Sequence, residues 1–208
     1  MLVTDPIHMA VFADLMAPRG LSVDAAFYRR HVHGRLNADF FAEFLPDEPD
    51  PQALSDAKEA EFRRRLPRPF PAMPGVMAFL DKARAQALPM AVVTNAKRDN
   101  AEAMLGAIGA RDYFEVIVSG EECARGKPEP DPYLEAMRLL GAAPERAIAF
   151  EDSPSGIRSA RAAGAFTVAV RSSLDDAALR AAGAALTIQD FTDPALPAIV
   201  RRLTGVHA

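Results

Sequence analysis

The sequence predicts an α/β fold in which a doubly wound, Rossmann-like parallel sheet adjoins a block of helices. Residues 1–66 read as helices joined by short loops, and no strand is expected among them. After residue 73, five short apolar runs alternate with amphipathic helical stretches, as is typical of parallel strands that helices cover on both faces. The two patterns meet in the proline-rich stretch PRPFPAMPG at residues 67–75, which favours a connection over a helix.

The spacing of apolar residues predicts each element in order. Helices are expected over residues 5–16, 23–31, 39–45 and 51–66, the last with apolar side chains near a 3.6-residue spacing. Strands are expected where short β-rich runs occur, at residues 90–94, 114–119, 147–151, 166–170 and 185–188. The helices between and around them are expected over residues 75–86, 98–108, 132–140, 155–163 and 175–181.

Composition excludes several classes of protein. The 24 basic residues are outnumbered by 28 acidic ones, which argues against a nucleic-acid partner, because such proteins need a basic face. The single cysteine, Cys123, excludes an internal disulfide and fits a reducing compartment. No leader peptide and no bilayer-spanning apolar run is recognised, so a cytoplasmic protein without a membrane partner is expected.

Polar residues follow three of the expected strands. Thr94-Asn95 follows MAVV, Ser119-Gly120-Glu121 follows EVIV, and Glu151-Asp152-Ser153 follows AIAF. In open α/β sheets ligands bind at the carboxyl ends of the strands, so a ligand site is expected where these residues meet.

Two stretches of the sequence favour a phosphate ligand. In VVTNA, the Thr94 hydroxyl and Asn95 can donate to phosphate oxygens, although such a pair more often caps the next helix. In GKPEPDPY, Pro128 and Pro130 stiffen the loop around Lys127, whose compact charge suits a phosphoryl group better than a solvated surface role.

A third stretch, FEDSPSGIRSA, favours a divalent cation. Glu151 and Asp152 are adjacent carboxylates after an apolar strand, where they repel each other and lose hydration unless a cation binds. A few oxygen ligands beside a phosphate site suit Mg²⁺, although Asp152 or Ser153 could merely cap the following helix. The four histidines show no metal-ligand spacing beyond the pair in HVH, so solvated or capping roles are expected for them.

In this order, VVTNA, GKPEPDPY and FEDSPSGIRSA resemble three successive motifs of the haloacid dehalogenase-like hydrolase superfamily, in the branch of phosphoglycolate phosphatases and β-phosphoglucomutase-like enzymes. TDPIH resembles the segment that leads into the family's helical cap. HGRLNADFF resembles the cap segment that meets substrate, whose Gly34 and Arg35 would help select the leaving group. The resemblance implies an α/β core of residues 1–8 and 73–208 and a helical cap of residues 9–72.

The resemblance also implies roles at the strand ends. Thr94, with Asn95 beside it, would bind the transferring phosphoryl group, and Lys127 would neutralise that group. Asp152 with Glu151 would hold Mg²⁺ as the cofactor.

The family's first motif has no counterpart in this sequence. That motif is a strand ending in Asp-x-Asp-Gly-Thr, whose first Asp is the nucleophile, and MLVT at residues 1–4 matches at best its tail. Neither Asp5 nor Asp14 follows an apolar strand, so neither is expected to replace it. The first, central strand, between those ending at Thr94 and Asp152, is therefore expected to be absent, which would leave buried backbone groups unsatisfied at roughly 1 to 3 kcal/mol each.

Three explanations for this departure stay open. The favoured one is that the true start lies upstream and carries the strand and the nucleophile. Alternatively, the protein is a relative that binds a phosphorylated ligand without catalysis, or another segment fills the gap and supplies a different acid.

The function expected is that of a Mg²⁺-dependent phosphatase acting on a small phosphate monoester of the sugar phosphate or phosphoglycolate type. The alternative from another class is a non-catalytic protein that binds a phosphorylated ligand or regulates. A β-phosphoglucomutase-like phosphotransfer is less favoured, because a mutase must hold a bisphosphate and the cap carries one lysine, Lys58. The expected partner is a small phosphorylated metabolite, and both a monomer and a homodimer remain open.

Overall fold

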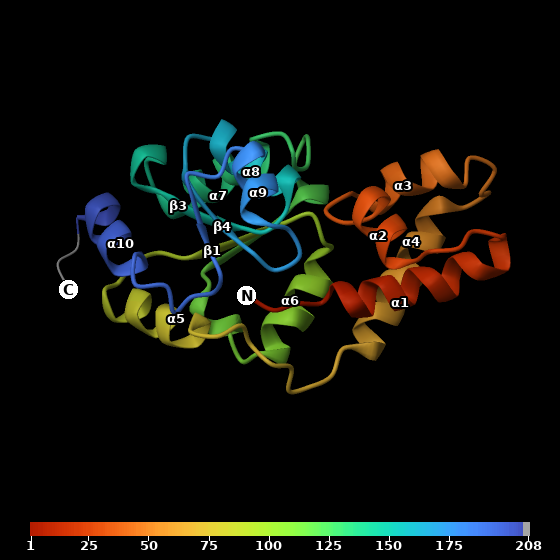
Figure 1. Cartoon of the computed structure of the whole chain (residues 1–208), viewed down its shortest axis with the longest axis horizontal. Helices are drawn as coiled ribbons and strands as arrows, with labels where there is room; N and C mark the ends of the chain where they lie inside the picture. The colour runs from red at the N-terminus through yellow and green to blue at the C-terminus, as the bar shows by residue number, and fades with distance from the viewer. Residues whose placement is uncertain (206–208) are drawn as a thin grey trace.

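The N-terminal half of the computed structural model, which describes residues 1–205, is helical. Its four helices confirm the four that the sequence predicts there: α1 (Asp5–Met16), α2 (Ala25–His31), α3 (Asn37–Phe44) and α4 (Pro51–Arg65). Two of them begin at aspartate caps, because Asp24 accepts from the Phe27 N–H at 2.7 Å and Asp50 accepts from the Ala53 N–H at 2.9 Å. In Figure 1 this block lies beside the sheet-bearing half, at the right of the view.

The remaining chain forms the α/β half, and all five predicted strands are present. They are β1 (Ala91–Thr94), β2 (Val116–Ser119), β3 (Ile148–Glu151), β4 (Phe166–Val170) and β5 (Leu186–Ile188). The helices around them are α5 (Val76–Ala85), α6 (Arg98–Ala107), α7 (Asp131–Leu140), α8 (Pro154–Ala162), α9 (Asp176–Ala181) and α10 (Leu196–Thr204). The sequence did not predict α10, whose start follows the turn-forming stretch QDFTDPA at residues 189–195. None of the described helices is both long and apolar enough to cross a bilayer.

The sheet is parallel throughout and is divided into two parts. β1 pairs with β2, with Thr94 opposite Ser119, and β4 pairs with both β3 and β5. Within residues 1–205 no strand joins β1 to β3, so nothing in the structure contradicts the expected absence of the central strand. Met1 and Leu2 pack against the main core cluster there, and the Met73 N–H donates to the Met1 carbonyl at 2.8 Å.

A small apolar cluster joins the two halves of the molecule. Phe62 of α4 has no exposed surface, and it packs with Val11 of α1 and with Ala103 and Ala107 of α6. The ring of His8 stacks on Phe62 at 3.8 Å between centroids. Because these contacts cross between the halves, the junction positions the helices that face the strand ends. The division into a core and a cap of residues 9–72 stays a prediction.

The junction cluster predicts a large cost for truncating Phe62. Phe62→Ala should lower the free energy of unfolding by about 3 to 5 kcal/mol, because it leaves a cavity between α4 and α6. Leu134→Ala, at a side chain on α7 that is 47% exposed, should change it by less than about 1 kcal/mol. Urea denaturation of both variants measures the difference, and equal losses would contradict the role given to Phe62.

Candidate active site

A cavity of about 340 Å³ lies between the helical half and the carboxyl ends of β1 and β3. Every site residue predicted from the sequence lines it: Gly34, Arg35, Thr94, Asn95, Lys127, Glu151 and Asp152. The fold thus brings together residues from four separate segments, at the sheet edge where ligands of such folds bind. Their individual roles stay predictions.

Lys127 is held at the division of the sheet. Its ammonium donates to the Val93 carbonyl of β1 at 2.9 Å and forms an ion pair with Glu151 at the end of β3. Both side chains are 7% exposed. The Tyr133 hydroxyl donates to the same Glu151 oxygen at 2.5 Å, and the Lys127 ammonium lies 5.1 Å from the Tyr133 ring centre. One buried carboxylate therefore fixes the cation in place.

The loop that carries Lys127 is tied to β1 by Asn95. The Asn95 amide donates to the Lys127 carbonyl at 3.1 Å and accepts from the Lys127 N–H at 3.0 Å. Its side chain therefore positions the lysine loop in this structure. Thr94, one residue earlier, accepts from the Ala96 N–H at 3.0 Å, and this contact leaves its hydroxyl proton for a ligand oxygen.

Asp152 supplies the carboxylate best placed for a cation. It lines the cavity, and the Ser172 hydroxyl donates to its Oδ2 at 3.1 Å. Within residues 1–205 no three His, Cys, Asp or Glu side chains gather to hold a metal by themselves. This donor set fits Mg²⁺, which takes one or two carboxylates and fills its other positions with waters and substrate oxygens.

The start of α8 receives the cap loop. Ser153 caps the helix by accepting from the Gly156 N–H at 3.1 Å, and the Ser155 hydroxyl donates to the Gly34 carbonyl at 3.1 Å. A Cβ on Gly34, which has a φ of +75°, would lie 3.0 Å from the Ser155 hydroxyl. Gly34 therefore lets the loop approach closely, and Arg35 beside it lines the cavity while pairing with Glu43 at 2.9 Å.

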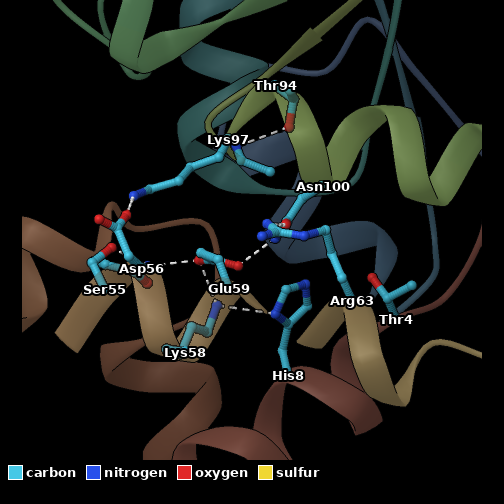
Figure 2. A network of polar contacts seen from close by, with 12 residues as sticks. Thr4, His8, Ser55, Asp56, Lys58, Glu59, Arg63, Thr94, Lys97 and Asn100 are labelled. Atoms are coloured by element: carbon cyan, nitrogen blue, oxygen red, sulfur yellow. Dashed lines mark hydrogen bonds and ion pairs between the residues drawn. The ribbon is translucent and has the colours of Figure 1, made fainter. Parts of the chain in front are cut away.

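The cap side of the cavity holds a polar network that the sequence did not reveal (Figure 2). The Lys58 ammonium lies 3.1 Å from His8 Nδ1 and 2.8 Å from Glu59, and Glu59 also accepts from Asn37 and from Asn100 of α6. Lys58, Glu59 and Asn100 are buried. Burial, and then the charge of Lys58, lower the pKa of His8 well below its usual value. His8 thus stacks on Phe62 and contacts Lys58 at the cavity wall, and the solvated or capping role expected for it is wrong.

A second cluster on this side is centred on Asp5. The Tyr28 hydroxyl donates to Asp5 Oδ1 at 3.1 Å, and His33 Nε2 lies 3.5 Å from Asp5 Oδ2. Burial is the main cause that raises the pKa of Asp5. The motif TDPIH marked this segment, but only the fold shows that both Asp5 and His8 face the cavity.

The space beside Glu151 predicts that a side chain at Gly156 destabilises the fold. A Cβ on Gly156 would lie 2.0 Å from the Glu151 carboxylate, which Lys127 and Tyr133 hold in place. Gly156→Ala should therefore destabilise the fold by about 1 to 3 kcal/mol.

Gly106 of α6 is the matched control, because a Cβ there meets nothing within 4 Å. Gly106→Ala should stabilise by about 0.5 to 1 kcal/mol, since alanine favours a helix. Urea denaturation measures both variants, and a neutral Gly156→Ala would show that Glu151 is not held in place.

Residues 2–170 match the sequence profile of a family described as haloacid dehalogenase-like hydrolase. The chain is 34% identical over 173 residues to protein CbbY of Rhodobacter capsulatus, an alignment that covers 77% of this chain and 76% of that protein. It is 35% identical over 147 residues to hexitol phosphatase A of Escherichia coli (strain K12), covering 71% of this chain and 62% of that protein. The alignment with the hexitol phosphatase thus spans less than two thirds of that relative's length.

Solved structures agree with this assignment. A mutant CbbY from Rhodobacter sphaeroides, in complex with xylulose-(1,5)bisphosphate, aligns with a TM-score of 0.81 at 29% identity, over 93% of this chain and 91% of that one. A β-phosphoglucomutase from Clostridium difficile aligns with a TM-score of 0.85 at 19% identity, over 99% of this chain and 93% of that one, a likeness of fold alone. The matched profile covers most of the chain, and the chain belongs to the haloacid dehalogenase-like hydrolase family.

Proposed function

We propose that this site serves the Mg²⁺-dependent hydrolysis of a small phosphate monoester. The observation that carries the proposal is the buried ammonium of Lys127, which shares one cavity with the Thr94 hydroxyl and the Asp152 carboxylate. A fixed cation, a hydroxyl donor and a hard oxygen ligand are the groups that phosphoryl transfer requires, because charge stabilisation and positioning dominate that reaction. Relatives named as phosphatases, such as hexitol phosphatase A, support the same activity.

The residues divide the work by their contacts. Thr94 donates to a phosphoryl oxygen, and Lys127 neutralises the group with the third of its three N–H donors, since Val93 and Glu151 receive the other two. Asp152 holds Mg²⁺, which when bound supplies positive charge to the phosphoryl oxygens. Glu151 acts through Lys127 as a positioning residue.

Whether a carboxylate is free to attack the phosphorus atom decides between an enzyme and a binding protein. Among residues 1–205, neither β1 nor β3 ends in the Asp-x-Asp pair of the family's first motif. Asp5 is the carboxylate that α1 brings to the cavity, and it is already engaged by Tyr28 and His33. This observation favours, as a second candidate function, a protein that binds a phosphorylated ligand without turnover.

Two measurements on the 208-residue chain test the proposal. Phosphate release from a panel of small phosphate esters and calorimetric binding of inorganic phosphate should both depend on added Mg²⁺. Thr94→Val and Lys127→Met should each reduce release by at least about 100-fold, because each removes a group that stabilises the transferring charge. Glu135→Gln, at an exposed ion pair on α7, is the control and should leave both measurements unchanged.

The outcomes separate the two candidate functions. Turnover supports the enzyme, whereas Mg²⁺-dependent phosphate binding without turnover supports the binding protein. In the second case, the same assay on a chain extended upstream shows whether a preceding segment restores hydrolysis. A chain that neither binds phosphate nor releases it would contradict the proposal.

A further inference from the structure

The cavity carries a nearly balanced set of charges. Four cationic side chains line it: Arg35, Lys58, Lys97 and Lys127. Five carboxylates line it with them: Asp5, Glu59, Glu121, Glu151 and Asp152. The side chains of the wall therefore offer no surplus of positive charge to an anionic ligand.

Each of the three lining cations other than Lys127 is already paired with an acid. Lys58 pairs with Glu59, Lys97 of the loop after β1 pairs with Asp56 of α4, and Arg35 pairs with Glu43. Asp56 and Glu43 are exposed and do not line the cavity, but they pair with residues that do and so add two further negative charges near it. Figure 2 shows Asp56, Lys58 and Glu59 close together on α4, with Lys97 reaching Asp56 from the loop that follows β1.

The Lys58–Glu59 pair cannot separate to receive a ligand. Glu59 also accepts hydrogen bonds from Asn37 and Asn100, and it is 5% exposed. Drawing Lys58 away would leave that carboxylate buried beside two neutral amides, which is a costly arrangement. His8 adds no charge either, because burial holds it in the neutral form.

Neutral hydrogen-bonding groups make up the rest of this side. The hydroxyls of Thr4 and Tyr28, the amide of Asn37 and the imidazole of His8 line the cavity. Such groups bind the hydroxyls of a sugar or polyol well, because they donate and accept without demanding a counter-charge. At about 340 Å³ the cavity has the size of a pocket for a small metabolite.

From this charge inventory we infer that the site selects phosphate monoesters of neutral, polyhydroxylated alcohols and rejects esters that carry a second phosphate or a carboxylate. The inference rests on the proposed function, in which one Mg²⁺ at Asp152 offsets one phosphoryl group. A second anionic group would enter the cap side, where every cation is matched by an acid. The ligand would then resemble the substrate in the name of hexitol phosphatase A more than the bisphosphate of the CbbY complex.

Calorimetric titration in the presence of Mg²⁺ tests the inference with four probes: inorganic phosphate, sorbitol phosphate, fructose bisphosphate and phosphoglycolate. If a probe is hydrolysed, its kcat/KM replaces its affinity in the comparison. Sorbitol phosphate should be preferred over the bisphosphate and over phosphoglycolate by at least about tenfold, which corresponds to roughly 1.4 kcal/mol.

A double variant then tests the cause of the preference. Glu43→Gln with Asp56→Asn leaves Arg35 and Lys97 unpaired, and it should narrow the gap between sorbitol phosphate and fructose bisphosphate by about fivefold or more. Glu102→Gln with Glu135→Gln is the matched control, because it removes two negative charges and leaves Arg111 and Arg138 unpaired away from the cavity. The control should keep the parent's preference.

The outcomes distinguish this inference from the function on which it rests. If inorganic phosphate fails to bind, the proposed function fails and the inference falls with it. If inorganic phosphate binds but fructose bisphosphate or phosphoglycolate binds as tightly as sorbitol phosphate, the inference alone is overturned. The same holds if the control variant narrows the gap as much as the double variant does.

Discussion

The buried ion pair between Lys127 and Glu151 is the contact on which the rest of the site depends. It bridges the two parts of a divided sheet, since Lys127 also bonds the carbonyl of Val93 in β1 while Glu151 ends β3. Removing one partner from such a pair leaves a buried charge uncompensated, at a cost of about 3 to 5 kcal/mol. Three residues support this ion pair. Asn95 holds the loop that carries Lys127, Tyr133 donates to the Glu151 carboxylate, and Gly156 leaves room for that carboxylate.

A second constraint fixes the opposite wall of the cavity. The Glu59 carboxylate accepts hydrogen bonds from Asn37 of the helical half and from Asn100 of α6. Asn100 in turn accepts from Arg63 of α4 at 2.6 Å. These polar contacts adjoin the apolar junction, because the Phe62 ring stacks on His8, which lies beside Lys58. Burial and hydrogen bonding therefore act together to set how the helical half stands over the strand ends. The charged side chains of this wall are paired with one another. On the inference above, the wall would contact a ligand through neutral groups, whereas the strand ends would contact it through charge.

Local sequence patterns were sufficient to predict most of the fold and the strand-end residues of the site. The five apolar runs were predicted as strands because short, continuously apolar runs between helices are typical of a buried parallel sheet. The polar residues that follow three of them were predicted to lie at the ligand-binding edge of that sheet. The helix α10 was missed, because its start follows a stretch rich in Pro and Asp that reads as a loop.

The cap-side wall could not be predicted, because its contacts join residues far apart in the chain. His8 and Lys58 are separated by 50 positions, and Glu59 and Asn100 by 41. No local sequence pattern predicts contacts between residues so far apart in the chain. The bonding of Asn95 to the lysine loop was missed for the same reason, since a Thr-Asn pair after a strand more often caps the next helix and gives no sign of a contact 32 residues away.

The most direct test of the account is a crystal structure of the chain grown with Mg²⁺ and inorganic phosphate. The account predicts phosphate within hydrogen-bond distance of the Thr94 hydroxyl and the Lys127 ammonium, with the metal between that phosphate and Asp152. Phosphate bound instead at Arg35 and Lys97, with the strand ends bare, would contradict it. That result would move the charged end of the ligand to the cap and remove the basis for placing phosphoryl chemistry at the ends of β1 and β3.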